Sequence, residues 1–133
     1  MAVFIDTSFF VAYSSKGDAN HGRAKELLAK AVRGDYGHIY TSDYVVDETL
    51  TTVLARTKSH KDAVKIGEYI LESEIVLLTV PADVFLSSWN MFKNTPRSFT
   101  DCTIVALMQA YKINYILTFD REFTNSKSVE VLR

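Results

Sequence analysis

The sequence predicts an α/β fold, a three-layer α/β/α sandwich built on a central, mostly parallel sheet. Short apolar runs alternate along the chain with amphipathic helical patterns, which is the element order of sheets that helices cover. The runs are apolar throughout rather than at every second position, as is typical of strands that helices bury on both faces. No repeat or Pro/Gly-rich linker interrupts this order, so we expect a single domain over residues 1–133.

Five segments are expected to form the strands of this sheet. They are rich in branched or aromatic apolar side chains, and most stop at a polar residue or a proline. The first ends at Asp6, the third stops before Pro81 and the fourth ends at Asp120. The predicted strands are Ala2–Ile5, roughly His38–Thr41, Glu74–Val80, Asn114–Phe119 and, with a weaker pattern, Val129–Leu132.

Five other segments place apolar residues three and four positions apart, the spacing of one face of a helix. In the second of them, Val46, Leu50 and Val53 form such a stripe, and Ser42 is placed as its N-cap. Trp89 falls in the fourth, where we expect it to pack in the core rather than to stack against bases. The predicted helices are Asn20–Arg33, Asp43–Thr57, Lys61–Glu72, Ala82–Lys93 and Thr100–Tyr111.

The composition excludes several classes of protein. The 133 residues are 47% hydrophobic and 23% charged with a net charge of −1, so contact with a nucleic acid would need a local basic patch. The first residues lack the pattern of a secretory leader, so none is expected, and no run comes close to the roughly 18 apolar residues of a membrane span. The only cysteine, Cys102, has no partner for an internal disulfide. We therefore expect a soluble protein of the cytoplasm.

Two acidic residues, Asp6 and Asp120, come directly after predicted strands. In parallel sheets, ligands bind in the crevice beyond the carboxyl ends of the strands, so both side chains are expected there. A third acid, Asp101, shares a helical face with Ile104 and Met108. An acid on an apolar stripe faces the protein interior, where an unpaired charge is costly, and it therefore requires a cation.

Each candidate acid also has a purely structural interpretation. Asp6 could cap a helix that follows it, Asp101 could form a capping box with Ser98, and Asp120 could cap a short turn. Glu48 lies beside the apolar stripe of its helix and could be a solvated position. Two acids at strand ends and a third that faces inward make a functional cluster the better interpretation of the set.

Other kinds of site find no support. The three histidines, His21, His38 and His60, lack the spacing of zinc ligands, and one cysteine supplies no second thiolate. The five glycines match neither nucleotide-binding fingerprint, and Ser8 has no serine-hydrolase signal around it.

Four motifs, in order, resemble those of the PIN-domain family, and within it the small VapC-type toxin ribonucleases. The similarity spans nearly the whole chain, and the order, type and spacing of the acids agree. The motifs are "VFIDTS" with Asp6, "VVDETL" with Glu48, "SFTDCTIVALM" with Asp101, and "ILTFDREF" with Asp120. The choice of Glu48 over Asp47 rests on this resemblance alone.

The resemblance implies a metal-dependent endoribonuclease with a PIN-like fold. It implies that the acids at Asp6, Glu48, Asp101 and Asp120 bind one or two Mg²⁺ or Mn²⁺ ions and are the catalytic residues. It also implies that the hydroxyls of Thr7, Ser8 and Thr118 support the site, that a cognate antitoxin protein blocks it, and that the chain forms a homodimer.

An acidic site needs basic neighbours if it is to attract RNA, because phosphate contacts dominate nucleic-acid affinity. Arg97 precedes Asp101 by four residues and Arg121 follows Asp120 directly, which makes both arginines candidate RNA contacts. Further basic candidates stand at the turn between two predicted helices, namely Arg56, Lys58 and Lys61. Two other functions stay open at this point. One is a catalytically weak RNA-binding module of the PIN type, and the other is a phosphoryl-transfer or receiver domain with a phosphorylated aspartate.

Overall fold

The computed structural model describes residues 1–133 and is built on one five-stranded parallel sheet. The strand order is β3-β2-β1-β4-β5, and every neighbouring pair is parallel. This confirms the predicted α/β/α class with its parallel sheet. The strands are β1 (Ala2–Ile5), β2 (His38–Ser42), β3 (Val76–Leu78), β4 (Tyr115–Leu117) and β5 (Glu130–Leu132).

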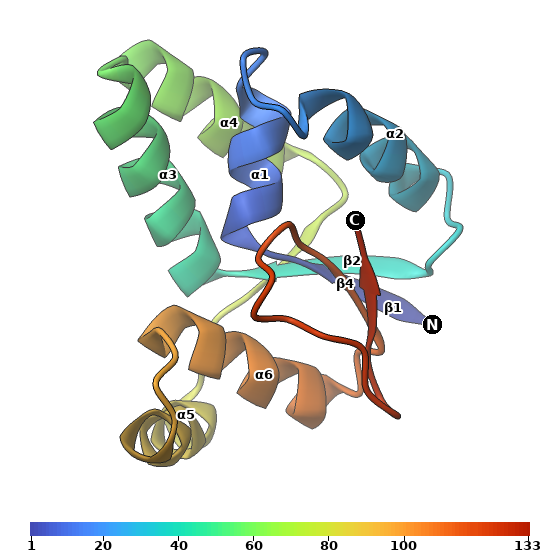
Figure 1. Ribbon diagram of the computed structural model, residues 1–133, viewed down its shortest axis with the longest axis vertical. Coiled ribbons are helices and arrows are strands. Elements are labelled where there is room, and N and C mark those ends of the chain that lie inside the picture. The colour runs from blue at the N-terminus through green and yellow to red at the C-terminus, as the bar shows by residue number, and fades with distance from the viewer.

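Six helices cover the sheet in two groups (Figure 1). Helices α1 to α4 pack against one another on one side, and α5 packs against α6 on the other. The first group is α1 (Thr7–Ser14), α2 (His21–Val32), α3 (Asp43–Thr57) and α4 (His60–Glu72). The second is α5 (Ala82–Asn94) and α6 (Phe99–Tyr111). No helix is long and apolar enough to cross a membrane.

The central strand explains how the sheet fixes the position of its acids. Val3, Phe4 and Ile5 of β1 are fully buried between the two helical layers. A shift of one residue in the register of β1 would move each of these side chains to the opposite face of the sheet, so the register is strongly specified. The backbone N–H of Asp6 donates to the carbonyl of Leu117 over 3.1 Å. The ends of β1 and β4 are therefore tied side by side at the carboxyl edge of the sheet.

Helix α1 is the element that the sequence pattern did not predict as a helix. Four of its apolar residues, Phe9, Phe10, Val11 and Ala12, are all buried. A helix that is covered on every side carries no alternation between polar and apolar faces, so its sequence lacks the helical signature. The interpretation of Asp6 as the cap of a following helix is nevertheless correct, because its side chain accepts from the backbone N–H of Thr7.

The prediction that Trp89 packs in the core is wrong. Its side chain lies on α5 and is 47% exposed, beside Phe92, whose ring centroid is 6.1 Å away. The physical reason is the layer arrangement: α5 packs chiefly on α6 and has no helix beyond it to cover its other face (Figure 1).

Candidate active site

Asp6 is held at the end of β1 by three donors. Its Oδ1 accepts from the backbone N–H of Thr7 over 2.7 Å, and its Oδ2 accepts from the hydroxyls of Thr118, over 2.7 Å, and Ser8, over 3.1 Å. The residue is only 2% exposed. Burial raises the pKa of the Asp6 carboxyl, the three hydrogen bonds act against this rise, and the charge of Glu48 adds to it.

The two hydroxyls that contact Asp6 also join the ends of β1 and β4. Ser8 Oγ and Thr118 Oγ1 lie 3.1 Å apart, Ser8 Oγ accepts from the backbone N–H of Phe119 over 2.9 Å, and Thr118 Oγ1 accepts from that of Asp120 over 3.0 Å. The network therefore sets the position of Asp6 and the direction in which the chain leaves β4 toward Asp120. Thr7 takes part through its backbone, since its buried hydroxyl has no partner.

Asp101 lies in the first turn of α6, where it lines a pocket and its carboxylate accepts no hydrogen bond. The backbone N–H of Asp101 donates to Ser98 Oγ over 3.1 Å, which confirms that Ser98 caps the helix. The residue is 6% exposed, and its nearest opposite charge is Arg97, whose Nη2 is 3.9 Å from Asp101 Oδ2. This spacing is too long for a direct hydrogen bond. The capping interpretation thus accounts for the backbone of Asp101 but leaves its carboxylate without a hydrogen-bond donor.

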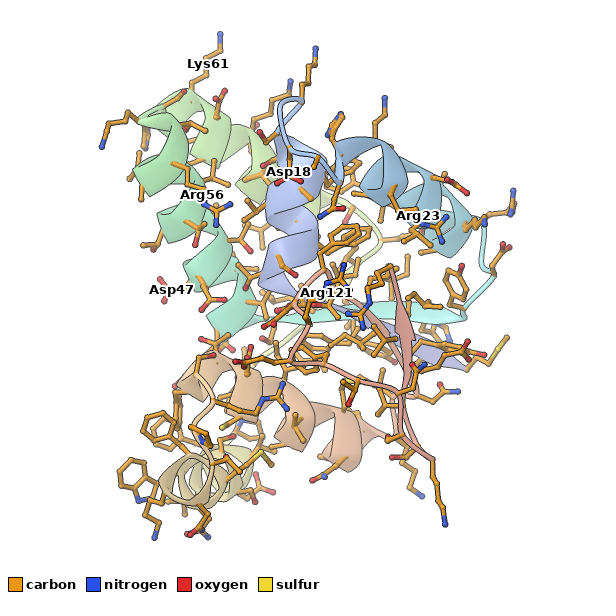
Figure 2. All side chains as sticks on the ribbon, in the orientation of Figure 1. Asp18, Arg23, Asp47, Arg56, Lys61 and Arg121 are labelled. Atoms are coloured by element: carbon orange, nitrogen blue, oxygen red, sulfur yellow. The ribbon has the colours of Figure 1, made fainter.

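Glu48 and Asp120 complete the group that the sequence singled out. Glu48 lies on α3 and is partly buried, whereas Asp47 beside it is exposed. Figure 2 shows Asp47 on the outer side of α3, away from α1. Asp120 follows β4 and also caps a turn, because its Oδ1 accepts from the backbone N–H of Glu122 over 2.9 Å.

All four predicted acids line one pocket of about 330 Å³. It opens at the carboxyl edge of the sheet between α1, α3 and the loop after β4. Its other lining residues are Thr7, Ser8, Val11, Ala12, Asp18, Asn20, Thr52, Arg56 and Phe119. Of these, the sequence prediction named Thr7 and Ser8 as site residues and missed the contributions of Asp18, Asn20 and Thr52.

The charges in this pocket repel one another. Burial raises the pKa of the Asp101 carboxyl to about 7; the nearby Asp6, Asp120 and Glu48 add to this rise, and Arg97 acts against it. A carboxyl with so high a pKa is costly to ionise in the metal-free protein. A divalent cation would remove the repulsion and allow all of the acids to stay ionised.

The donor set fits a hard divalent cation such as Mg²⁺ or Mn²⁺, which prefers oxygen ligands. Two observations support the fit: the carboxylate of Asp101, which lines the pocket, has no hydrogen-bond donor, and the buried hydroxyl of Thr7, which lines the same pocket, has no partner. Carboxylate oxygens of Asp101, Asp120 and Glu122 also lie within 4.8 Å of one another. The sequence reasoning missed Glu122, because a loop glutamate carries no periodic signal.

The two arginines expected to contact RNA take different positions. Arg97 is partly buried: its guanidinium lies 4.5 Å from the centroid of the Phe123 ring and approaches Asp101. Arg121 is exposed at the loop after β4 and lies on the face of the molecule turned to the viewer in Figure 2. The structure thus places Arg97 against a site carboxylate and Arg121 in solvent beside the site.

Comparison with known proteins identifies the family. Residues 3–127 match the model of the PIN domain. The chain belongs to the PIN domain family. This match confirms the family that the sequence motifs predicted.

Two curated relatives place this PIN-domain chain among the VapC proteins. It is 34% identical over 132 residues to the 23S rRNA-specific endonuclease VapC20 of Mycobacterium tuberculosis, covering 97% of each chain. It is 26% identical over 129 residues to a VapC ribonuclease of Archaeoglobus fulgidus, covering 93% of this chain and 80% of that one.

Solved structures agree with the fold. The crystal structure of M. tuberculosis VapC20, described as a sarcin–ricin loop cleaving toxin, superposes with a TM-score of 0.78 at 32% identity, covering 89% of each chain. VapBC2 of Rickettsia felis, solved with a promoter DNA fragment, superposes with a TM-score of 0.69 and covers 99% of this chain and 98% of that one. At 17% identity this second match shows the fold alone.

Proposed function

We propose that this PIN-domain protein is a metal-dependent endoribonuclease that hydrolyses RNA phosphodiester bonds with Mg²⁺ or Mn²⁺. The observation that carries the proposal is the pocket in which Asp6, Glu48, Asp101 and Asp120 meet, where the carboxylate of the largely buried Asp101 has no hydrogen-bond donor. Both VapC relatives are ribonucleases, one of them specific for 23S rRNA, and this supports the same chemistry.

We propose that the four acids have different roles in binding one or two metal ions. Asp6 and Asp101 are the principal ligands, while Glu48 and Asp120 hold a second ion or orient water. When bound, such an ion lowers the pKa of a coordinated water and offsets charge on the phosphate. The hydroxyls of Ser8 and Thr118 keep Asp6 in place, as their hydrogen bonds to its Oδ2 indicate.

Arginines are proposed to supply the positive charge that an acidic site needs toward RNA. Arg121 is exposed next to Asp120 and is free to contact a phosphate. Arg97 is proposed to act at the edge of the cluster. Its side chain is 24% exposed and neutralises part of the charge of Asp101 before RNA arrives.

Cleavage of RNA by the purified protein in the presence and absence of metal tests the proposal. With Mn²⁺ added, we expect cleavage of at least one RNA in a panel of ribosomal, transfer and messenger RNAs. Excess EDTA should abolish it and further Mn²⁺ should restore it, because water at pH 7 is a poor nucleophile without a bound cation. Ribosomal RNA is the first substrate to try, because VapC20 is specific for 23S rRNA. Cleavage that persists undiminished in EDTA would contradict the proposal.

We further propose that the protein is a toxin that acts in the cytoplasm and that a cognate antitoxin occupies its site. The support is its kinship with VapC20, whose structure is described as that of a toxin. Co-expression with the product of a neighbouring gene should yield a complex that does not cleave RNA. Full ribonuclease activity in such a complex would count against an inhibitory partner.

The chain is also proposed to form a homodimer through α5. Phe85, Leu86, Trp89 and Phe92 fall on this helix and are 42%, 61%, 47% and 40% exposed. A contiguous apolar surface of this kind is typical of an interface between proteins. In the monomer this apolar surface of α5 is exposed to water, and a second copy of the chain would bury it.

The variant Trp89→Glu is expected to shift the protein from dimer to monomer, because a charge would have to be buried in the apolar interface. Light scattering coupled to gel filtration measures the mass of each variant. Glu26→Gln on α2, which changes a charge away from α5, is the control and should leave the mass unchanged. A wild-type protein of 15.0 kDa at micromolar concentrations would show that α5 does not pair with itself.

A further inference from the structure

The pocket that holds the acids continues along α3, away from the sheet. Helices α1 and α3 both begin at the carboxyl edge of the sheet and run away from it side by side (Figure 1). The pocket follows them: it is lined by Asp6 and Asp120 at the sheet, by Val11 and Ala12 of α1, and by Arg56 near the end of α3. A substrate that reaches the acids therefore has a wall of α3 beside it.

The wall of α3 carries three polar side chains in line. Glu48, Thr52 and Arg56 all line the pocket, and residues four positions apart lie on the same face of a helix. At 1.5 Å per residue, Arg56 is roughly 12 Å along the axis from Glu48. Figure 2 shows the Arg56 side chain on the side of α3 that faces α1. The separation of Glu48 and Arg56 along α3 is longer than one nucleotide, so a phosphate at the acids and a phosphate at Arg56 cannot be the same group.

Arg56 is the only cationic residue among the 13 that line the pocket, and five of the others are acids. If it served to neutralise one of them, an ion pair would be expected. It takes part in none of the four ion pairs of the structure, and its side chain is exposed. An unpaired guanidinium is well suited to a phosphate, which its donors can bind at two points.

We propose that Arg56 binds the phosphate of a nucleotide that flanks the cleaved bond, so that the RNA backbone lies along α3 from the acids to Arg56. The inference rests on the proposed ribonuclease function and assigns a path to its substrate. Asn20 lines the same pocket and can donate to the same strand. Asp18 lies beyond the end of α1 (Figure 2), and its Oδ1 accepts from the backbone N–H of Asn20 over 2.8 Å. Its negative charge would repel a phosphate bound near Arg56.

Comparing a short RNA with a longer one distinguishes phosphate binding by Arg56 from a role in catalysis. The variant Arg56→Gln should raise KM for an RNA of about ten nucleotides on the order of tenfold, since a charge-assisted contact to phosphate is lost. It should also lower the slope of log affinity against log salt by about one. Cleavage of a dinucleotide with a single phosphodiester, and the affinity for Mn²⁺, should not change, because neither reaches Arg56.

Two further variants make the test specific. Arg33→Gln removes the same charge from an exposed arginine, paired with Asp35, that does not line the pocket, and it should behave as the wild type. Asp18→Asn should act in the opposite direction to Arg56→Gln and tighten binding of the longer RNA. The proposed path is wrong if Arg56→Gln slows cleavage of the dinucleotide as much as cleavage of the longer RNA. It is also wrong if Arg56→Gln and Arg33→Gln cleave both substrates equally well.

Failure of the ribonuclease function would give a different result. Binding of the uncleaved ten-nucleotide RNA, followed by fluorescence anisotropy in an Asp101→Asn background, does not depend on cleavage. If the wild type cleaves no substrate but Arg56→Gln still weakens this binding about tenfold and reduces its salt slope, the path along α3 stands and the proposed activity fails. If Asp101→Asn binds the RNA equally well with and without Arg56→Gln, the proposed path along α3 is wrong.

Discussion

Asp101→Asn is expected to lose at least about 100-fold in the rate of RNA cleavage with Mn²⁺ while keeping the fold. The substitution preserves the size of the side chain and the backbone N–H that donates to Ser98. It removes the ionised oxygen that a divalent cation requires, and groups that merely orient metal ligands are already worth roughly 10–100-fold. Initial cleavage rates at saturating RNA, with circular dichroism as the test of folding, measure the effect.

The same variant should make the metal-free protein more stable at pH 8. The folded pKa of Asp101 is raised to about 7 from an ordinary value of 3.8. The folded state therefore binds an extra proton between these two pH values, and the free energy of unfolding falls as pH rises through this window. Above pH 7 the wild type keeps an ionised Asp101 among other acids, whereas the asparagine variant does not.

Thermal melting in EDTA at pH 5 and pH 8 tests this opposition between stability and activity. We expect the melting temperature of Asp101→Asn to exceed that of the wild type at pH 8 and the difference to shrink at pH 5. Asp47→Asn is the matched control, since Asp47 is exposed on the outer side of α3. A variant at position 101 that cleaves at the wild-type rate would remove this carboxylate from the mechanism.

The parallel strands and the position of two acids at the ends of strands were predictable for physical reasons that act locally. Buried parallel strands require continuous apolar runs, and the residue after each strand necessarily lies at the carboxyl edge of the sheet. Asp6 and Asp120 therefore followed from position alone. Glu48 did not: its helix buries Val45, Thr49 and Val53, and Glu48 lies next to this stripe, so only the family resemblance distinguished it from Asp47.

What the sequence left out depends on packing between distant elements. Helix α1 has no polar face because α2, α3 and α4 pack around it, and no local pattern records those neighbours. Trp89 was misplaced because the stripe of an amphipathic helix does not tell which side a neighbour covers. Glu122 reaches the site through a loop, and its spacing from the acids became meaningful only in three dimensions. Arg56 was one of several basic candidates in the sequence, and only the fold places it in the pocket with the acids.

Mn²⁺ is expected to stabilise the folded protein strongly, and more so at pH 8 than at pH 5.5. A cation that binds only the folded state raises the free energy of unfolding by about 2.7 kcal/mol at 100 times its dissociation constant. Metal binding requires an ionised Asp101, whose pKa of about 7 leaves it mostly protonated at pH 5.5. Each bound ion must then displace a proton, which weakens its apparent affinity as the pH falls.

Calorimetric titration with Mn²⁺ in two buffers of different ionisation enthalpy distinguishes this mechanism from simple screening of charge. At pH 6, where the carboxyl of Asp101 is mostly protonated, the apparent binding enthalpy should differ between the buffers, because protons are released; at pH 8 the two values should converge. In Asp101→Asn the dependence on buffer should largely vanish together with most of the affinity. If the wild type binds Mn²⁺ equally well at both pH values without proton release, the acids do not form a shared metal site, and the repulsion among them must be relieved by some other group.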